Sequence, residues 1–302
     1  MRATNDDLFA PLDRAFDAGL VRRHSAPGAR ALLFSGGVDS TLLAWEFRTR
    51  PDLRLVTIGV AGSPDLRAAE SAAREIGLPH AAVEITDREI FAVEADLREE
   101  LPRENPVVRS VLVALALAIR AAPAEELLCG QGADELFLGY AHFRGLGASE
   151  AAARARSDLA RLLEDDWPRS ERIAHRFGRR LRSPYLDPGF IAAALAVPID
   201  RRLPGDMPKA FFRAWAEHRG LPPSLARRPK RAMQYGSGVD RLLRRRPAPA
   251  TTGGPGYPPP PRRPGRATRQ PRMRTAGAPR RPQAGSGTLG RPASAIASSL
   301  SS

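Results

Sequence analysis

The chain has 302 residues, of which 47 are basic and 33 acidic, so its formal charge is +14 at neutral pH. The charge is unevenly placed, because residues 241–302 hold thirteen arginines and no Asp, Glu or Lys. The preceding residues are nearly neutral, so a polyanionic partner such as a nucleic acid is suggested only by the tail.

The composition of the tail also argues against a packed core. Residues 241–302 contain twelve prolines and a single aromatic residue, Tyr257. So little apolar surface cannot offset the entropy of ordering. We predict one folded domain over residues 1–240 and a disordered Arg-, Pro- and Gly-rich tail over 241–302. For the tail, an electrostatic arm and an extension without selected function are both open.

Cysteine usage and hydropathy exclude several classes of protein. The one cysteine, Cys129, excludes an intrachain disulfide and a zinc site built from cysteines. The start, MRATNDDLFA, is acidic and has no apolar segment, so a secretory signal is not expected. The longest apolar run, 111–119, is shorter than the roughly 20 residues that a membrane span needs. A cytoplasmic protein without membrane contact is the expectation.

Strands and helices alternate in the first half of the chain. Apolar runs predict four strands, at residues 31–34, 53–60, 81–85 and 127–129, the last of them buried. Helices are predicted at 41–47, 66–76, 87–101 and 106–121, with Ser63 as a cap and Pro64 at a first helical position. This alternation predicts an α/β fold with a doubly wound parallel sheet. Helical signals interrupted by prolines from 149 to about 220 predict a helical C-terminal extension.

Two glycine-containing loops follow predicted strands and should therefore lie at the same edge of the sheet. They are SGGVDS, residues 35–40, and CGQGADE, residues 129–135. In the first loop, glycines let the backbone approach an anion, and the hydroxyls and helix-start amides can donate to phosphate oxygens. Asp39 would repel phosphate unless Mg²⁺ lies between them, and Asp134 could complete such a site. Helix capping is the alternative role for both aspartates.

The SGGxDS pattern resembles the pyrophosphate-binding loop of the ATP pyrophosphatases, the PP-loop enzymes. Further segments occur in the order seen in asparagine synthetases: GSPDLRAAESA (62–72), LCGQGADELFLGY (128–140), RSPYLD (182–187) and RRPKRAMQYGSG (227–238). Over residues 30–240 the chain resembles the synthetase domain of that family, which includes β-lactam synthetase. The resemblance implies the PP-loop, adenine nucleotide alpha hydrolase type of fold. It also implies an ATP-dependent ligase that forms AMP and pyrophosphate.

The resemblance assigns roles to the residues of both loops. It implies that the β and γ phosphates are held by Ser35, Gly36, Gly37, Asp39 and Ser40. The same resemblance makes Asp39 and Asp134 the Mg²⁺ ligands. The adenine would lie against the backbone near Phe34, Ile58, Cys129 and Gly130. The role of meeting the charge that develops on the phosphoryl oxygens falls to Lys230.

The two lysines of the chain receive different interpretations. With 45 arginines and two lysines present, a lysine at 230 indicates a need for a compact ammonium charge. A surface cation in a basic loop is the alternative for Lys230. Because Lys209 lies in a helical stretch with Arg213 four residues on, we interpret Lys209 as an ordinary surface cation.

Three departures from the family pattern bear on the reaction. Glutamine-dependent asparagine synthetases have a glutamate where this chain has Gln131, and an amide cannot accept a proton as a carboxylate does. We expect Gln131 to hold a substrate amino or carboxyl group instead. Arg180 replaces a usual glutamate and would invert a charge near the acceptor pocket. The chain starts Met1-Arg2-Ala3 and lacks the N-terminal cysteine of the family's glutaminase domain.

These observations leave three functions open. The first is an amide ligase that activates a carboxylic acid, with aspartate as the default, and uses free ammonia, a substrate amine or nitrogen from a separate glutaminase subunit. The second is a PP-loop enzyme that modifies tRNA, with the arginine tail contacting phosphates. The third is a non-catalytic ATP-binding module that regulates a partner.

Overall fold

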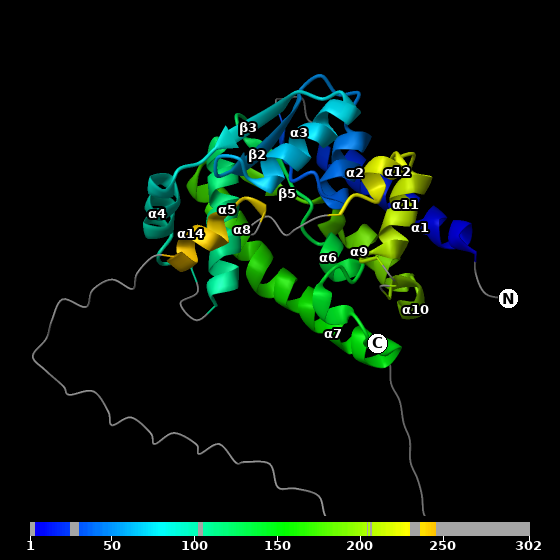
Figure 1. Ribbon diagram of the computed structural model, residues 1–302. Helices are drawn as coiled ribbons and strands as arrows, with labels where there is room; N and C mark the ends of the chain where they lie inside the picture. The colour runs from blue at the N-terminus through cyan, green and yellow to red at the C-terminus, as the bar shows by residue number, and fades with distance from the viewer. Residues whose placement is uncertain are drawn as a thin grey trace, which may run out of the picture. The chain divides into compact units, whose positions relative to one another are not determined.

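A five-stranded parallel sheet lies at the centre of the folded chain (Figure 1). The structure, a computed structural model, describes residues 4–24, 30–101, 105–203, 205, 207–229 and 236–245. The strands are β1 (Arg30–Leu33), β2 (Leu53–Gly59), β3 (His80–Glu84), β4 (Glu126–Leu128) and β5 (Arg180–Arg182). Their order is β3-β2-β1-β4-β5, and every neighbouring pair is parallel. The predicted doubly wound parallel sheet is confirmed.

Helices precede, connect and follow the strands. Up to β4 they are α1 (Asn5–His24), α2 (Val38–Glu46), α3 (Pro64–Ile76), α4 (Asp87–Asp96) and α5 (Pro106–Ala121). Between β4 and β5 lie α6 (Ala133–Leu136), a 3-10 turn (Ala141–Phe143), α7 (Ala148–Arg161), a π-helical turn (Leu162–Asp166) and α8 (Trp167–Arg176). After β5 come a 3-10 turn (Pro184–Leu186), α9 (Pro188–Ala196), α10 (Ile199–Arg202), α11 (Ala210–His218), α12 (Pro223–Ala226) and α14 (Val239–Arg245).

The middle of the sheet is buried on both faces, each under its own group of helices (Figure 1), whereas the edge strand β3 is largely exposed. In β1, Leu32 belongs to the core shared with α1, α2, α9 and α11. Its neighbours Ala31 and Leu33 belong to the core shared with α4, α5, α8 and α14. Successive side chains of a strand point to opposite faces. A strand covered on both sides therefore reads as the continuous apolar run seen in the sequence.

Most predicted helices are confirmed, with shifts at their ends. The helix at 106–121 matches α5, whereas α2 begins at Val38 and so includes Asp39 in its first turn. The predicted helix at 87–101 ends earlier, since α4 stops at Asp96. Ser63 is the N-cap of α3 as predicted, but its side chain makes no capping hydrogen bond. Strand β5 was not predicted, because three residues between helical stretches carry too little pattern.

The folded part continues past residue 240. Helix α14 extends to Arg245, and its Leu242 and Leu243 pack against the core that contains α4 and α5. The predicted start of the tail at 241 is therefore too early. Residues 246–302 lie outside the described residues, so their predicted disorder stays a prediction.

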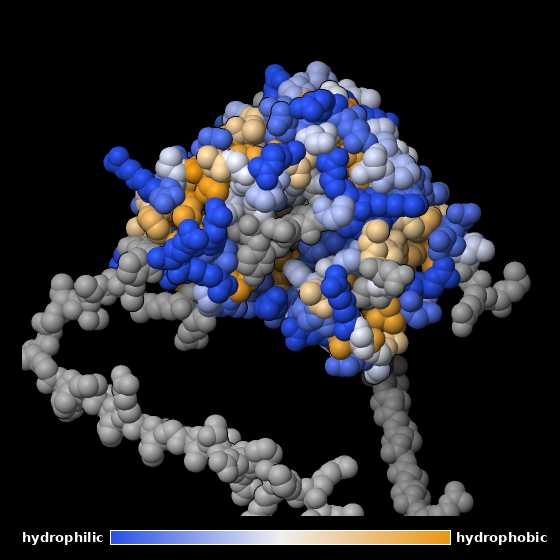
Figure 2. All heavy atoms as spheres, in the orientation of Figure 1, coloured by the Kyte–Doolittle hydropathy of each residue, from blue (hydrophilic) through white to orange (hydrophobic). Residues whose placement is uncertain are grey.

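The face of the molecule shown in Figure 2 is mainly hydrophilic, with hydrophobic groups in small separate areas. Among the described residues, the large hydrophobic side chains that are exposed are Val21, Val107, Leu163, Leu195 and Met207. Isolated apolar side chains of this kind are normal on a protein surface. None of the described helices has the length and apolar character needed to cross a bilayer.

Candidate active site

The loops after β1 and β4 meet at the carboxyl edge of the sheet. These two strands are neighbours, and the strand order runs outward from them in both directions. In open α/β sheets, ligands bind outside the carboxyl ends at this point. An added Cβ on Gly130 would lie 2.9 Å from the Cβ of Asp39. A glycine is therefore needed for the two loops to approach this closely.

The first loop is shaped to hold an anion. Gly36 has φ +68°, and an added Cβ would lie 3.1 Å from the backbone of Ala68 and Ala69 in α3. Across the loop, the hydroxyls of Ser35 and Ser40 lie 3.3 Å apart, and the Ser35 amide donates to Ser40 Oγ at 3.2 Å. These groups gather at the N-terminal end of α2, where helix amides favour negative charge.

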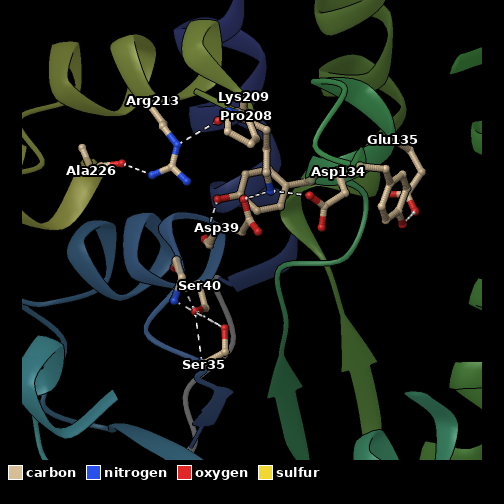
Figure 3. Close-up of polar contacts among 12 residues, drawn as sticks. Ser35, Asp39, Ser40, Asp134, Glu135, Pro208, Lys209, Arg213 and Ala226 are labelled. Carbon is tan, nitrogen blue, oxygen red and sulfur yellow. Dashed lines mark hydrogen bonds and ion pairs between the residues drawn. The ribbon is translucent and has the colours of Figure 1, made fainter. Parts of the chain in front are cut away.

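The two predicted metal ligands converge on one cation (Figure 3). The ammonium nitrogen of Lys209 lies 2.6 Å from Asp39 Oδ1 and 2.7 Å from Asp134 Oδ1. The capping alternative fails, since the N-caps of α2 and α6 are Gly37 and Gly132. The aspartates instead follow the N-caps, and both carboxylates point to a shared position.

Lys209 is a site residue that the sequence analysis missed. Its side chain is 6% exposed, so the interpretation as an ordinary surface cation is wrong. Burial alone would lower the pKa of Lys209, but the charges of Asp134 and Asp39 outweigh it and raise that pKa. The available signal was composition, because the argument made for Lys230 applies equally to the other lysine of the chain.

The donor set fits a magnesium ion held together with a phosphate ligand. Within the described part of the chain, no group of three or more His, Cys, Asp or Glu side chains is arranged to hold a metal. The two loops place two carboxylates, those of Asp39 and Asp134, close enough to bind one metal ion. Mg²⁺ is commonly bound by one or two carboxylates, with water and substrate phosphates as its remaining ligands.

A cavity at the ends of β1 and β2 includes part of the predicted adenine site. Its lining is formed by Leu33, Phe34, Ser35, Val56, Thr57, Ile58, Asp65 and Ala118. Thr57 Oγ1 donates to the carbonyl of Phe34 at 2.5 Å. The predicted residues Phe34 and Ile58 therefore share this cavity with Ser35. The other two, Cys129 and Gly130, are not among its lining residues.

The side chain of Gln131 is engaged by the protein. Its amide nitrogen donates to Ser170 Oγ at 3.4 Å, and the Cys129 thiol donates to its amide oxygen at 3.6 Å. The Ser183 hydroxyl also donates to the carbonyl of Gln131 at 2.6 Å. Burial raises the pKa of the Cys129 thiol to about 12, in keeping with the expected unreactive apolar role.

A buried acid and phenol adjoin the cation position. The Tyr140 hydroxyl donates to Glu135 Oε1 at 2.5 Å. Burial first, and the charge of Asp134 second, raise the pKa of Glu135 to about 7. Partial protonation near neutral pH limits the negative charge beside Asp134. Sequence reasoning did not single out this pair, although both residues lie within the quoted LCGQGADELFLGY segment.

Lys230 lies outside the described residues, so its predicted role stays a prediction. The segments on either side of it both contact α3. The guanidinium of Arg228 donates to the carbonyl of Ala68 at 2.9 Å, and an added Cβ on Gly236 would overlap the carboxylate of Asp65. The same helix borders Gly36.

Arg180 does not place its charge at this edge of the sheet. It is in register with Glu126, at the amino end of β5, and its guanidinium lies 4.0 Å from the carboxylate of Glu125. Its side chain is 61% exposed. The expected inverted charge near an acceptor pocket stays a prediction, since nothing among the described residues locates that pocket.

The fold and the site define an α/β protein with a parallel sheet, in which the loops after β1 and β4 bring two carboxylates together on one lysine. The family model of asparagine synthase matches residues 12–156 and 145–248. The chain belongs to the asparagine synthase family, which confirms the resemblance stated above.

Curated relatives carry the same family name. The chain is 26% identical over 274 residues to a putative glutamine-hydrolysing asparagine synthetase of Methanocaldococcus jannaschii, covering 77% of this chain and 50% of that protein. It is 28% identical over 242 residues to the Bos taurus enzyme and 29% identical over 238 residues to the Gallus gallus enzyme, covering 73% of this chain and 42% of each relative. The chain thus spans about half the length of the relatives it matches.

Solved structures match at low similarity. An ammonia-dependent NAD synthetase from Campylobacter jejuni is 15% identical, covering 65% of this chain and 94% of that chain, with a TM-score of 0.33. A U34-tRNA thiolase from Methanococcus maripaludis is 13% identical, covering 83% of this chain and 84% of that chain, with a TM-score of 0.33.

Proposed function

We propose that the chain is an ATP-dependent amide ligase that releases AMP and pyrophosphate. One observation carries the proposal: Asp39 and Asp134, from two separate loops, converge on one cation position beside the Ser35–Ser40 loop. Membership of the asparagine synthase family supports the same reaction class. ATP would lie across the ends of β1, β2 and β4.

Each loop has a defined task in this reaction. The Ser35–Ser40 loop holds the β and γ phosphates through its amides and hydroxyls. Asp39 and Asp134 would hold Mg²⁺, which neutralises charge on the triphosphate. Lys230 meets the charge that develops on the phosphoryl oxygens.

The reaction has two steps. A substrate carboxylate oxygen attacks the α phosphorus, the α–β anhydride bond breaks, and pyrophosphate leaves. An amine nitrogen then attacks the acyl carbon, AMP leaves, and the amine loses a proton. That proton passes to solvent, because the amide of Gln131 cannot take it. Gln131, whose side chain is held by Ser170 and Cys129, would instead orient a substrate amino or carboxyl group. Aspartate is the default acid, and ammonia, free or supplied by a separate glutaminase subunit, is the default amine.

The test is substrate-dependent exchange of labelled pyrophosphate into ATP, run over the amino acids and then over tRNA. We expect exchange with a carboxylic acid and Mg²⁺, followed by AMP and amide formation when ammonium is added. An Asp134→Asn variant should lose exchange, whereas Arg227→Met, which removes an exposed guanidinium paired with Glu217, should retain it.

Other outcomes would contradict the proposal. Formation of ADP and orthophosphate rejects the AMP-forming class. Exchange with tRNA alone favours an RNA-modifying enzyme. Tight ATP binding without exchange across every acceptor favours a regulatory module.

A further inference from the structure

The Lys209 ammonium lies between the carboxylates of Asp39 and Asp134, the two loop residues that would hold a metal ion (Figure 3). Its nitrogen is 2.6 Å from Asp39 Oδ1 and 2.7 Å from Asp134 Oδ1. The side chains of Lys209 and Asp39 are 6% and 5% exposed, whereas that of Asp134 is 34% exposed. The ammonium and the metal would therefore compete for the same carboxylate oxygens.

The protein holds Lys209 firmly in this place. Lys209 is the N-cap of α11 and has φ 58° and ψ 35°, a left-handed conformation that is unfavourable for a residue with a side chain. One turn further along α11, Arg213 donates to the carbonyls of Pro208 at 2.9 Å and Ala226 at 2.5 Å. The first bond holds the backbone just before Lys209, and the second ties α11 to α12.

A glycine leaves space for the lysine side chain. An added Cβ on Gly139 would lie 2.7 Å from Lys209 Cε and would overlap Asp134 Oδ1. The chain therefore leaves Gly139 without a side chain where the ammonium and the carboxylate meet. The left-handed backbone of Lys209, the hydrogen bonds of Arg213 and the close approach to Gly139 together fix the ammonium between the two carboxylates.

The charges determine what a metal must do to bind. Two carboxylates held this close repel each other unless a cation lies between them, and the ammonium supplies that cation. A metal ion that takes the carboxylate oxygens breaks two charge-assisted hydrogen bonds. It also leaves a buried ammonium without a counter-ion, which is strongly unfavourable. A triphosphate arriving with the metal would give the displaced ammonium a new anionic partner.

We propose that Lys209 is the resident counter-ion of the metal site and makes binding of the metal depend on binding of the nucleotide. Without nucleotide, the ammonium keeps the two carboxylates paired and excludes the metal. With nucleotide, the ammonium moves to a phosphate oxygen and the carboxylates take the metal. The identity of the nucleotide rests on the proposed function, whereas the competition between ammonium and metal does not.

The test is binding of Mn²⁺ to the full chain, followed by the electron paramagnetic resonance signal of the free ion. We expect weak binding to the nucleotide-free wild type and binding at least about tenfold tighter when ATP is present. For Lys209→Met without nucleotide, we expect Mn²⁺ to bind at least about tenfold tighter than to the wild type. Mn²⁺ should also raise the thermal unfolding midpoint of this variant more than that of the wild type.

Two further variants separate competition from a general effect of charge. Lys209→Met combined with Asp134→Asn lacks one ligand and should lose the tighter Mn²⁺ binding. Arg227→Met removes an exposed cation paired with Glu217 and should bind Mn²⁺ like the wild type. A nucleotide-free wild type that binds Mn²⁺ as tightly as Lys209→Met would overturn the inference.

The wild-type measurements decide the question even where the single variant does not fold. Tight Mn²⁺ binding without nucleotide, or binding that ATP leaves unchanged, rejects the inference. Coupled binding of Mn²⁺ and ATP without pyrophosphate exchange would reject the ligase but keep the inference. Pyrophosphate exchange together with Mn²⁺ binding that ATP does not change would keep the ligase but reject the inference.

Discussion

The loops after β1 and β4 meet at one cation, but they differ in how far each is closed to solvent. Asp39 lies in the first turn of the nine-residue α2, is 5% exposed, and accepts a hydrogen bond from Tyr185 at its backbone carbonyl. Asp134 lies in the four-residue α6 and is 34% exposed. The aspartate of the first loop is therefore held within the protein framework, whereas that of the second loop is partly open to solvent.

The largest expected difference between the loops is in the stability of their aspartate variants. Asp39→Asn and Asp134→Asn should both lower pyrophosphate exchange by about 10²–10³-fold, because each removes charge stabilisation at the phosphates. Asp39→Asn should also lower the free energy of unfolding by about 3 kcal/mol, since it breaks a buried ion pair. For Asp134→Asn we expect about 1 kcal/mol, since water screens a partly exposed pair. Urea unfolding measures the change in unfolding free energy for each variant. Equal changes would mean that the two aspartates are equally shielded from solvent.

A second expected difference concerns the close packing of the first loop. Gly36 and Gly77 both have positive φ, but an added Cβ meets backbone at 3.1 Å only at Gly36 and open space at Gly77. Gly77→Ala should cost about 1 kcal/mol of unfolding free energy from backbone strain alone. Gly36→Ala should cost about 2 kcal/mol and also weaken ATP binding. Similar changes in unfolding free energy for both variants would show that α3 shifts at little cost to make room for the added methyl group.

The thiol at the start of the second loop tests how far that loop is open. With the pKa of Cys129 raised to about 12 by burial, thiolate is scarce at pH 8. We expect an aromatic disulfide reagent to react with the native chain only at the rate of unfolding, and quickly in urea. Because Cys129 is the one cysteine of the chain, the colour released reports this site alone. Fast reaction of the native protein would place the whole second loop in solvent.

The smallest expected effect lies beside the cavity at the ends of β1 and β2. Burial lowers the pKa of His80, whose ring nitrogen lies 2.8 Å from Thr57 Oγ1. The unfolded chain then binds a proton at higher pH than the folded chain, so unfolding free energy falls as pH drops below about 6.5. His80→Gln should remove that part of the fall between pH 7.5 and 5.5. If urea unfolding of the variant shows the same pH dependence as the wild type, the fall in unfolding free energy comes from other groups.

Sequence patterns were sufficient for the sheet and for both loops. The four predicted strands match β1 to β4. Buried parallel strands such as β1 and β2 have a continuous apolar signature, whereas β3 at the edge of the sheet is largely exposed. Placing Asp39 and Asp134 at one edge followed from the polarity of parallel strands. The patterns failed for β5 and α14, which are short and owe their structure to packing against the rest of the domain.

The sequence by itself determined the α/β class, the family, and the two loops that carry serine hydroxyls and carboxylates. Those features are written in residues that are close together in the chain. Only the tertiary structure decided that Lys209 joins them, since it is 170 positions away from Asp39. A lysine has no local pattern that separates a surface cation from a buried counter-ion. That role is set by the carboxylates that the fold brings to it.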